Sequence, residues 1–236
     1  MDVGFILEML PALLPAVKNT LLITFASAAL GWAAGFAIAL ARAHRVRGLS
    51  QALSVYVSFL RSVPLVIIMF FIYYAIPTFI AFYRYEHGLD VAVAAGNRNV
   101  IYPIIAMSLS ESAFASEVFR SSLSAVSHDQ MEAARSVGMT AVQAYRRIVL
   151  PQAIVVAIPN LGGLFVGLVK SSTLAYYASV VEITGMAYTL ASPSYQFLEA
   201  FFVIALLYEA LSFGFSRLFL AIERNVGKYR RGIVLK

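Results

Sequence analysis

Three ionisable side chains, Glu111, Glu117 and Lys170, interrupt stretches of the sequence that are otherwise apolar. Charged groups inside a membrane are costly and usually face a bundle interior or a wet cavity, so each is a candidate for the path of a polar solute. The Glu111 carboxylate, between Ser110 and Ser112, could receive an ammonium group or a cationic side chain. An internal ion pair with Lys170 explains this carboxylate equally well, and both interpretations stay open.

The other polar groups near these positions have simpler interpretations. Glu117 precedes Arg120 by three residues, a spacing that favours a local ion pair on one helix over contact with a ligand. Ser172 and Thr173 could add neutral hydrogen bonds around Lys170, although the polar end of a helix accounts for them nearly as well.

Catalysis and metal binding are not indicated by the sequence. Cysteine is absent, and the three histidines, His44, His87 and His128, fall on different segments without the spacing of metal ligands. A Gly-x-x-x-x-Gly-Lys-Ser/Thr phosphate loop is also missing, so any ATP must be hydrolysed by another chain. We therefore predict no catalytic residue, no metal site and no cofactor in this chain, and a membrane-embedded enzyme is the least favoured class.

Composition indicates that these residues sit in a membrane protein. Hydrophobic residues make up 61% of the chain and charged residues 13%, whereas globular proteins average about 45–50% and about 25%. Mean hydropathy is +0.80. The net charge of +6 is not gathered in a basic stripe interleaved with aromatic residues, so nucleic acid is not an expected partner.

Five stretches reach the roughly 20 apolar residues that a helix needs to cross a bilayer. They cover approximately residues 20–41, 56–82, 100–119, 153–177 and 197–222. The prediction is an all-α integral membrane protein whose domain of five transmembrane helices spans residues 20–222. Residues 1–19, with Pro11 and Pro15, are expected to form a helix or turn at the interface, and residues 223–236 a basic cytoplasmic tail.

Two pairs of glycines are four residues apart inside the expected spans, Gly31 with Gly35 and Gly163 with Gly167. Such pairs let helix backbones approach closely in lipid. They also occur simply because membrane helices are rich in glycine, and the sequence does not decide between these explanations.

Orientation is predicted from Lys and Arg, which are in excess in the cytoplasmic loops of membrane proteins. The basic residues of one side are Arg42, Arg45, Arg47 and Arg61 around the first loop, Arg120, Arg135, Arg146 and Arg147 around the third, and Arg217, Arg224, Lys228, Arg230, Arg231 and Lys236 at the end. The opposite side has Lys18, Arg84 and Arg98, the latter two diluted by Glu86 and Asp90. We therefore expect the N-terminus outside and the C-terminus inside.

Two short helices joined at a glycine corner are predicted between the third and fourth spans, in the loop of residues 121–151. Capping boxes, in which an N-cap Ser or Thr pairs with a Gln three residues on, are expected at Ser127 with Gln130 and at Thr140 with Gln143. Gly138 can supply the left-handed residue that closes the first helix. The second helix is expected to end before Pro151, because the residue preceding proline disfavours the helical conformation.

This loop resembles the coupling loop of the permease subunits of ABC importers. The hallmark of that family is Glu-Ala-Ala, a glycine a few residues later and a hydrophobic-Leu-Pro ending, and the matching residues are Glu132, Ala133, Ala134, Gly138, Leu150 and Pro151. In the family this corner docks in a groove of the ATPase subunit. The resemblance therefore implies that these residues couple the chain to an ATPase.

The resemblance extends over nearly the whole chain and is closest to the branch that imports polar amino acids. It is carried by residues 61–65 (Arg-Ser-Val-Pro-Leu), residues 113–120, Pro159, residues 170–174 (Lys-Ser-Ser-Thr-Leu) and Glu182. Ser171 departs from the pattern, since the branch usually has Asp there, and any ion pair built on that carboxylate is missing. The implied fold is a type I importer bundle similar to that of methionine importers.

The resemblance also implies a function and a set of partners. The chain would be the permease of an ATP-driven importer of a polar amino acid in the bacterial cytoplasmic membrane, and cystine is favoured because residues 157–163 look like cystine-type members. Its expected partners are a cytoplasmic ATPase dimer that binds ATP and Mg²⁺, a second permease copy or related subunit, an extracytoplasmic solute-binding protein and the lipid bilayer. The alternative is a gradient-driven secondary transporter, which would not need the corner between Glu132 and Pro151.

Overall fold

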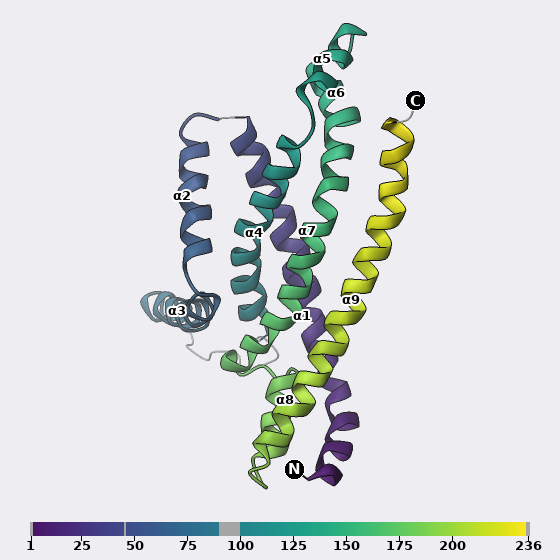
Figure 1. The fold of residues 1–236 in the computed structure, drawn as a ribbon. Helices are drawn as coiled ribbons and strands as arrows, with labels where there is room; N and C mark the ends of the chain where they lie inside the picture. Colours follow the sequence, from purple (N-terminus) through teal and green to yellow (C-terminus); the bar gives the residue numbers. More distant parts are fainter. Residues whose placement is uncertain (1, 45, 90–99, 235–236) are drawn as a thin grey trace.

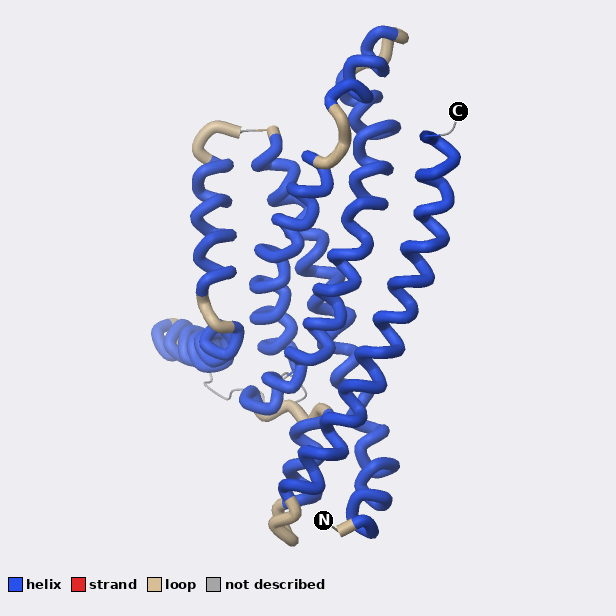
Figure 2. The backbone as a smooth tube through the Cα atoms, in the orientation of Figure 1, coloured by secondary structure: helices blue, strands red, loops and turns tan. Residues whose placement is uncertain are grey.

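The computed structural model describes residues 2–44, 46–89 and 100–234, and these residues are helical with short connections (Figures 1 and 2). The helices are α1 (Val3–Ala43), α2 (Leu49–Ser62), α3 (Leu65–Glu86), α4 (Ile101–Ser124), α5 (His128–Ser136), α6 (Ala141–Ala144), α7 (Leu150–Ser171), α8 (Ile183–Ala191) and α9 (Phe197–Val234). The all-α prediction is thus confirmed. Four residues used for the expected orientation lie outside the described residues: Arg45, Asp90, Arg98 and Lys236.

Helices α1 and α4 pack backbone to backbone at the first glycine pair. A Cβ atom built on Gly31 would lie 2.7 Å from the Cβ of Glu111, and one on Gly35 would lie 2.8 Å from both the Cβ of Ala115 and the carbonyl oxygen of Ser112. Real side chains do not approach this closely, so only glycine fits. This contact decides between the two explanations for Gly31 and Gly35, because both serve close helix packing.

Replacing Gly35 by Ala is expected to destabilise the bundle by about 1–3 kcal/mol, the usual cost of overpacking, because backbone atoms of α4 have no room to move aside. Gly214→Ala on α9 is the matched control, since a Cβ atom there meets nothing within 4 Å. The control should keep or raise stability, because alanine is the better helix former. Thermal unfolding of the two purified variants measures the difference, and equal midpoints would contradict the packing role.

The expected second span, residues 56–82, is wrong as a single helix. Helix α2 ends at Ser62, Val63 is extended with φ −86° and ψ 130°, and α3 begins after Pro64. Figure 1 shows α2 upright and α3 nearly end-on, so the two helices run across one another. The cause is Pro64, which excludes the helical conformation at the residue before it and offers no N–H to continue the hydrogen bonds.

The expected third span is present as α4, although it is less apolar than its neighbours. Among the residues that the structure describes, four helical segments are long and apolar enough to cross a membrane: Val3–Ala43, Leu65–Glu86, Ala141–Ala178 and Phe197–Gly227. Helix α4 instead packs against α1, α2, α3 and α7, and it buries Ser110, Glu111 and Ser112. A helix covered by protein does not need the hydropathy that contact with lipid demands.

The expected boundaries at residues 19 and 222 both fall inside continuous helices, α1 and α9. Helix α1 runs through Pro11 and Pro15 without interruption, and Met9 and Leu13 are buried. The helix contacts α8 and α9, and such neighbours allow proline inside a membrane helix. Asp2 caps its first turn, and the hydrogen bond from the Phe5 N–H lowers the pKa of that carboxyl. Likewise α9 continues to Val234, so the expected tail begins within a helix.

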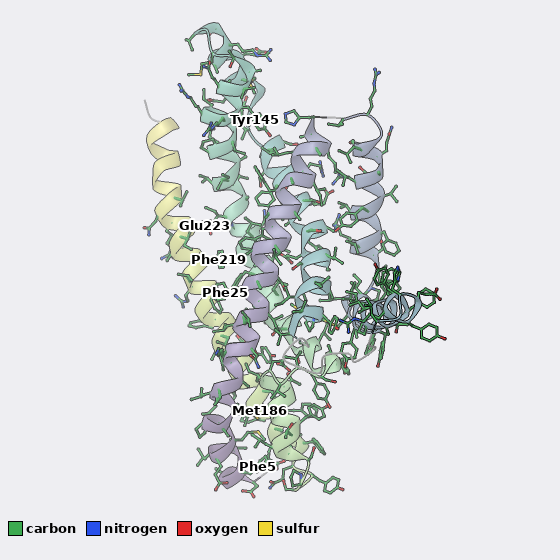
Figure 3. All side chains as sticks on the ribbon, turned by 180° about the vertical axis from the view of Figure 1, so that it is seen from behind. Phe5, Phe25, Tyr145, Met186, Phe219 and Glu223 are labelled. Atoms are coloured by element: carbon green, nitrogen blue, oxygen red, sulfur yellow. The ribbon has the colours of Figure 1, made fainter. Side chains whose placement is uncertain are left out.

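An aromatic cluster joins α1, α7 and α9 at the middle of the bundle. The ring of Phe165 on α7 lies 5.0 Å from that of Phe25 and 5.5 Å from that of Phe219, measured between centroids. Figure 3 shows Phe25 and Phe219 at similar heights on α1 and α9. Aromatic pairs at these separations stabilise beyond the area they bury, so α7 is held firmly between its two neighbours.

Candidate functional site

A cavity of about 440 Å³ opens where the bend between α2 and α3, at residues 61–65, meets α4 and α7. This volume is within the roughly 300–1,000 Å³ that small-molecule sites occupy. Its lining combines polar residues, glycines and apolar side chains: Arg61, Ser62, Ser110, Glu111 and Ser171; Gly163 and Gly167; and Val63, Pro64, Leu65, Met107, Phe114, Leu164 and Leu168.

Glu111 is the anionic group of this cavity. Its side chain is only 5% exposed, and its Oε1 accepts a hydrogen bond of 2.8 Å from Nε1 of Trp32. Gly31 packs against its Cβ and so fixes the position of the carboxylate from behind. The ion pair with Lys170 that the sequence left open is not formed between these described residues, since Lys170 is exposed and outside the lining.

Arg61 is the cationic group, and sequence reasoning placed it wrongly beside the first loop. It lies at the far end of α2, a helix of 14 residues that is about 20 Å long at 1.5 Å per residue. Its guanidinium carbon is 5.6 Å from the centroid of the Phe114 ring, a cation–π contact. The missed signal was an arginine inside an apolar stretch just before Pro64, where the helix had to end.

Of the other polar residues predicted for the substrate path, some line the cavity and others form hydrogen bonds inside the helix bundle. Ser110 lines the cavity together with Glu111. Three others are outside the lining and form hydrogen bonds within the bundle. The hydroxyl of Ser112 pairs with Tyr56 Oη at 2.8 Å, that of Ser172 donates to the Val169 carbonyl at 2.7 Å, and that of Thr173 pairs with Thr184 Oγ1 at 2.6 Å. The local ion pair of Glu117 with Arg120 is confirmed at 2.7 Å, and Arg42 of α1 joins it.

Glu182, the acid of the family pattern, holds the end of the bundle opposite to the loop of α5 and α6. It is fully buried and caps α8, accepting hydrogen bonds of 3.0 Å from the N–H groups of Thr184 and Gly185. Tyr208 of α9 donates to the same carboxylate at 2.7 Å. The carboxylate is therefore engaged in fixing α8 to α9 and does not face the cavity.

The first helix of the predicted corner, α5, is closed by Gly138 as expected. This glycine has φ 84°, its N–H donates to the Arg135 carbonyl at 3.0 Å, and the Met139 N–H donates to the Ala134 carbonyl at 3.1 Å. This pattern is a Schellman motif, which requires a left-handed residue. At the other end Ser127 is the N-cap, but it accepts from the Asp129 N–H, so the box expected with Gln130 is not formed there.

The second helix begins as predicted and ends differently. Thr140 and Gln143 form the expected capping box. The prediction that this helix stops before Pro151 is wrong, because α6 passes through a π-helical turn, Tyr145–Val149, into α7. The wider turn places Pro151 in the first turn of α7, where the missing N–H of proline costs little. One continuous helical segment thus runs from the corner into α7 (Figure 1), and Gly163, Gly167 and Ser171 of α7 line the cavity.

The corner projects from one end of the molecule. It lies at the same end as the C-terminal part of α9, whereas α8 and the beginning of α1 lie at the opposite end (Figure 1). Ala134 is buried, while Glu132 and Ala133 are exposed. Val137 and Val142 are 74% and 75% exposed at the tip. Exposed apolar residues beside exposed charge are typical of a surface that binds another protein.

Comparisons with known proteins agree with these features. Residues 33–228 match the family model described as "Binding-protein-dependent transport system inner membrane component". A probable amino-acid permease protein of Bacillus subtilis (strain 168) is 35% identical over 96% of each chain. An L-cystine transport system permease protein of the same strain is 32% identical over 99% of this chain and 95% of its own. A nopaline transport system permease protein of Agrobacterium fabrum (strain C58 / ATCC 33970) is 36% identical over 99% and 95%.

Solved structures confirm the predicted fold class. An amino acid ABC transporter crystallised with histidines superposes with a TM-score of 0.80 at 27% identity, over 95% of this chain and 99% of the other. An inward-facing MetNI methionine ABC transporter superposes with a TM-score of 0.72 at 21% identity, over 96% and 99%. The second match shows the fold alone, which is the methionine-importer-like bundle expected from the sequence.

Proposed function

This chain belongs to the family of binding-protein-dependent transport system inner membrane components, and we propose that it is the permease subunit of an ATP-driven amino-acid importer. The observation that carries the proposal is a cavity with one cation and one anion, connected by a single helical segment to an exposed corner of the Glu-Ala-Ala and glycine type. In this proposal the chain is not catalytic, and ATP and Mg²⁺ bind to the partner ATPase dimer.

The two charges of the cavity suit the head group that all free amino acids share. Arg61 and Glu111 both line the cavity, and the described ion pairs do not join them to each other. Free amino acids carry a carboxylate and an ammonium group on one carbon. The Arg61 guanidinium can bind the carboxylate and Glu111 the ammonium, and charge-assisted hydrogen bonds of this kind are about twice as strong as neutral ones. Cystine is the proposed substrate, supported by the L-cystine permease relative.

In this proposal, different partners bind at the two ends of the molecule. The corner around Glu132 and Gly138 docks on the cytoplasmic ATPase dimer, and an extracytoplasmic solute-binding protein delivers the amino acid at the end where α1 begins. This orientation places the N-terminus outside and the C-terminus inside. It is supported by Arg135 in the last turn of α5 and by Arg146 and Arg147 in the π-helical turn that follows α6. A second permease copy, or a related subunit, completes the translocation path.

Reconstitution tests this proposal directly. The permease, its ATPase, the second permease subunit and the solute-binding protein are placed in proteoliposomes, and uptake of radiolabelled cystine and other amino acids is followed. We expect uptake to require ATP on the side of the ATPase. Uptake by the permease alone, driven by an ion gradient, would establish a secondary transporter and overturn the proposal.

Glu132→Ala is expected to weaken recruitment of the ATPase about tenfold or more. Glu132 is exposed on α5, where its carboxylate can accept from donors across the interface, and a hydrogen bond to a charged group contributes about 1.5–3 kcal/mol. Glu223→Ala is the matched control, because Glu223 is an exposed carboxylate on α9, away from the corner (Figure 3). Titration of ATPase onto the immobilised permease measures the effect, and equal affinities for the two variants would refute a role for Glu132.

A further inference from the structure

The cavity lining contains one basic and one acidic residue, and in the proposed site both bind the head group of the amino acid, which leaves no charged residue for the substrate side chain. Arg61 and Glu111 are the charged residues among the described lining, and the other members are hydroxyl-bearing, glycine or apolar. The nearest other ionisable groups along the chain are engaged or outside, since Glu117 pairs with Arg42 and Arg120 and Lys170 lies beyond the lining. Once the two head-group charges are bound, a charged side chain has no counter-ion, and burying such a charge is costly.

The α7 wall of the cavity offers room for a side chain. Gly163, Gly167 and Ser171 follow each other at intervals of four residues, which places them along one face of α7, and all three line the cavity. A Cβ atom built on Gly163 or Gly167 meets no heavy atom within 4 Å. This second glycine pair therefore does not pack against a described helix, in contrast to Gly31 and Gly35. The open space in front of it is bordered by Met107, Phe114, Leu164 and Leu168.

We propose that the cavity selects amino acids whose side chain carries no net charge, and that Gly163, Gly167 and Ser171 determine which side chains fit. The inference rests on the proposed function, because it assumes that Arg61 and Glu111 hold the head group. It includes neutral amino acids of moderate size. It also includes cystine, because the ammonium and the carboxylate of its second half are on one carbon and offset each other, so that no net charge is buried. Arginine, lysine, aspartate and glutamate are excluded.

Ligand binding to the permease–ATPase complex in the absence of the solute-binding protein tests the selection at this cavity alone. A ligand that binds only the folded state raises its thermal midpoint, and the rise grows with the logarithm of the ratio of ligand concentration to Kd. Cystine, glutamine and methionine should raise the midpoint of the wild-type complex, whereas arginine, lysine and glutamate at equal concentration should leave it unchanged. A wild-type complex that binds arginine or glutamate as tightly as the neutral amino acids overturns the inference.

Three α7 variants test two of the residues named, Ser171 and Gly167. Ser171→Asp adds a second carboxylate and should improve binding of lysine or arginine about tenfold or more relative to glutamine, as close charge pairs do at interfaces. Ser171→Asn, the uncharged variant of the same shape, should not. Gly167→Leu should abolish binding of methionine and retain that of alanine. If Ser171→Asp and Ser171→Asn bind the same amino acids, α7 does not set the selection.

Failure of the inference is distinguishable from failure of the proposed function. Arg61→Met should abolish the thermal shift with every amino acid if the head-group site is correct, whatever the side chain. A wild-type complex that binds neutral and charged amino acids equally, and loses both with Arg61→Met, overturns the inference alone. A wild-type complex whose midpoint responds to no amino acid overturns the cavity as the substrate site and the inference with it.

Discussion

Exchanging Glu111 for Gln is expected to lower amino-acid uptake at subsaturating substrate by roughly 30-fold to several thousand-fold, while the thermal stability of the empty complex is retained. Removing one partner of a buried charge pair costs about 2–5 kcal/mol, which gives this range. Within the described residues the carboxylate accepts a hydrogen bond from the Trp32 N–H, and in the proposed site its charged partner is the ammonium group of the substrate. A glutamine oxygen can accept that hydrogen bond as well.

Controls for this variant separate binding from folding. Glu223→Gln makes the same chemical change at an exposed position of α9 and should transport at the wild-type rate. If Glu111 were instead neutralised by Lys170, stability would fall together with uptake, and adding Lys170→Met would restore both. Recovery in that double variant, or wild-type uptake by Glu111→Gln, would remove Glu111 from the substrate site.

Replacing Gly138 by Val is expected to uncouple ATP hydrolysis from transport, with at least a tenfold loss of uptake and a bundle that still assembles in the membrane. Gly138 has φ 84°, and a β-branched residue there is strained by about 1–3 kcal/mol. The strain opens the Schellman closure, so α5 loses its fixed angle to α6. ATPase activity and uptake measured on the same reconstituted complex give the coupling ratio.

Gly48→Val controls for strain by itself. Gly48 also has positive φ, 76°, with nothing within 4 Å of a built Cβ atom, but it lies in the loop between α1 and α2. Both variants should lose similar stability, and only Gly138→Val should lose coupling. Equal coupling ratios in the two variants would show that the corner tolerates a change of shape.

The corner formed by α5 and α6 could be predicted almost residue by residue because its determinants are local. The capping box of Thr140 and the left-handed Gly138 are decided by neighbours within a few positions, and both are as expected. The prediction failed at Ser127, whose capping box with Gln130 is not formed, and at Pro151, where a π-helical turn let the helix continue. That turn depends on how α7 packs in the bundle, which spacing along the chain does not reveal.

The cavity could not be predicted because its parts come from distant segments. Hydropathy merged α2 and α3 into one span, and only the break at Pro64 brings Arg61 to the wall opposite α7. The sequence identified Glu111 as an exception within an apolar helix, but its partner depended on α1, where Gly31 admits the carboxylate and Trp32 binds it. The individual ionisable residues could thus be recognised in the sequence, whereas their proximity in one cavity depends on the packing of distant helices.

Because α6 continues through the π-helical turn into α7, this segment can transmit a tilt at one end to the other end as a rigid body. From Ala141 to Ser171 it measures about 45 Å at 1.5 Å per residue, with the corner at one end and the wall of Gly163, Gly167 and Ser171 towards the other. A tilt of about 5° over such a length displaces the far end by about 4 Å, close to the width of a methyl group in van der Waals contact. In the proposed importer, a movement of the corner against the ATPase would therefore be transmitted along this backbone directly to the residues of α7 that line the cavity.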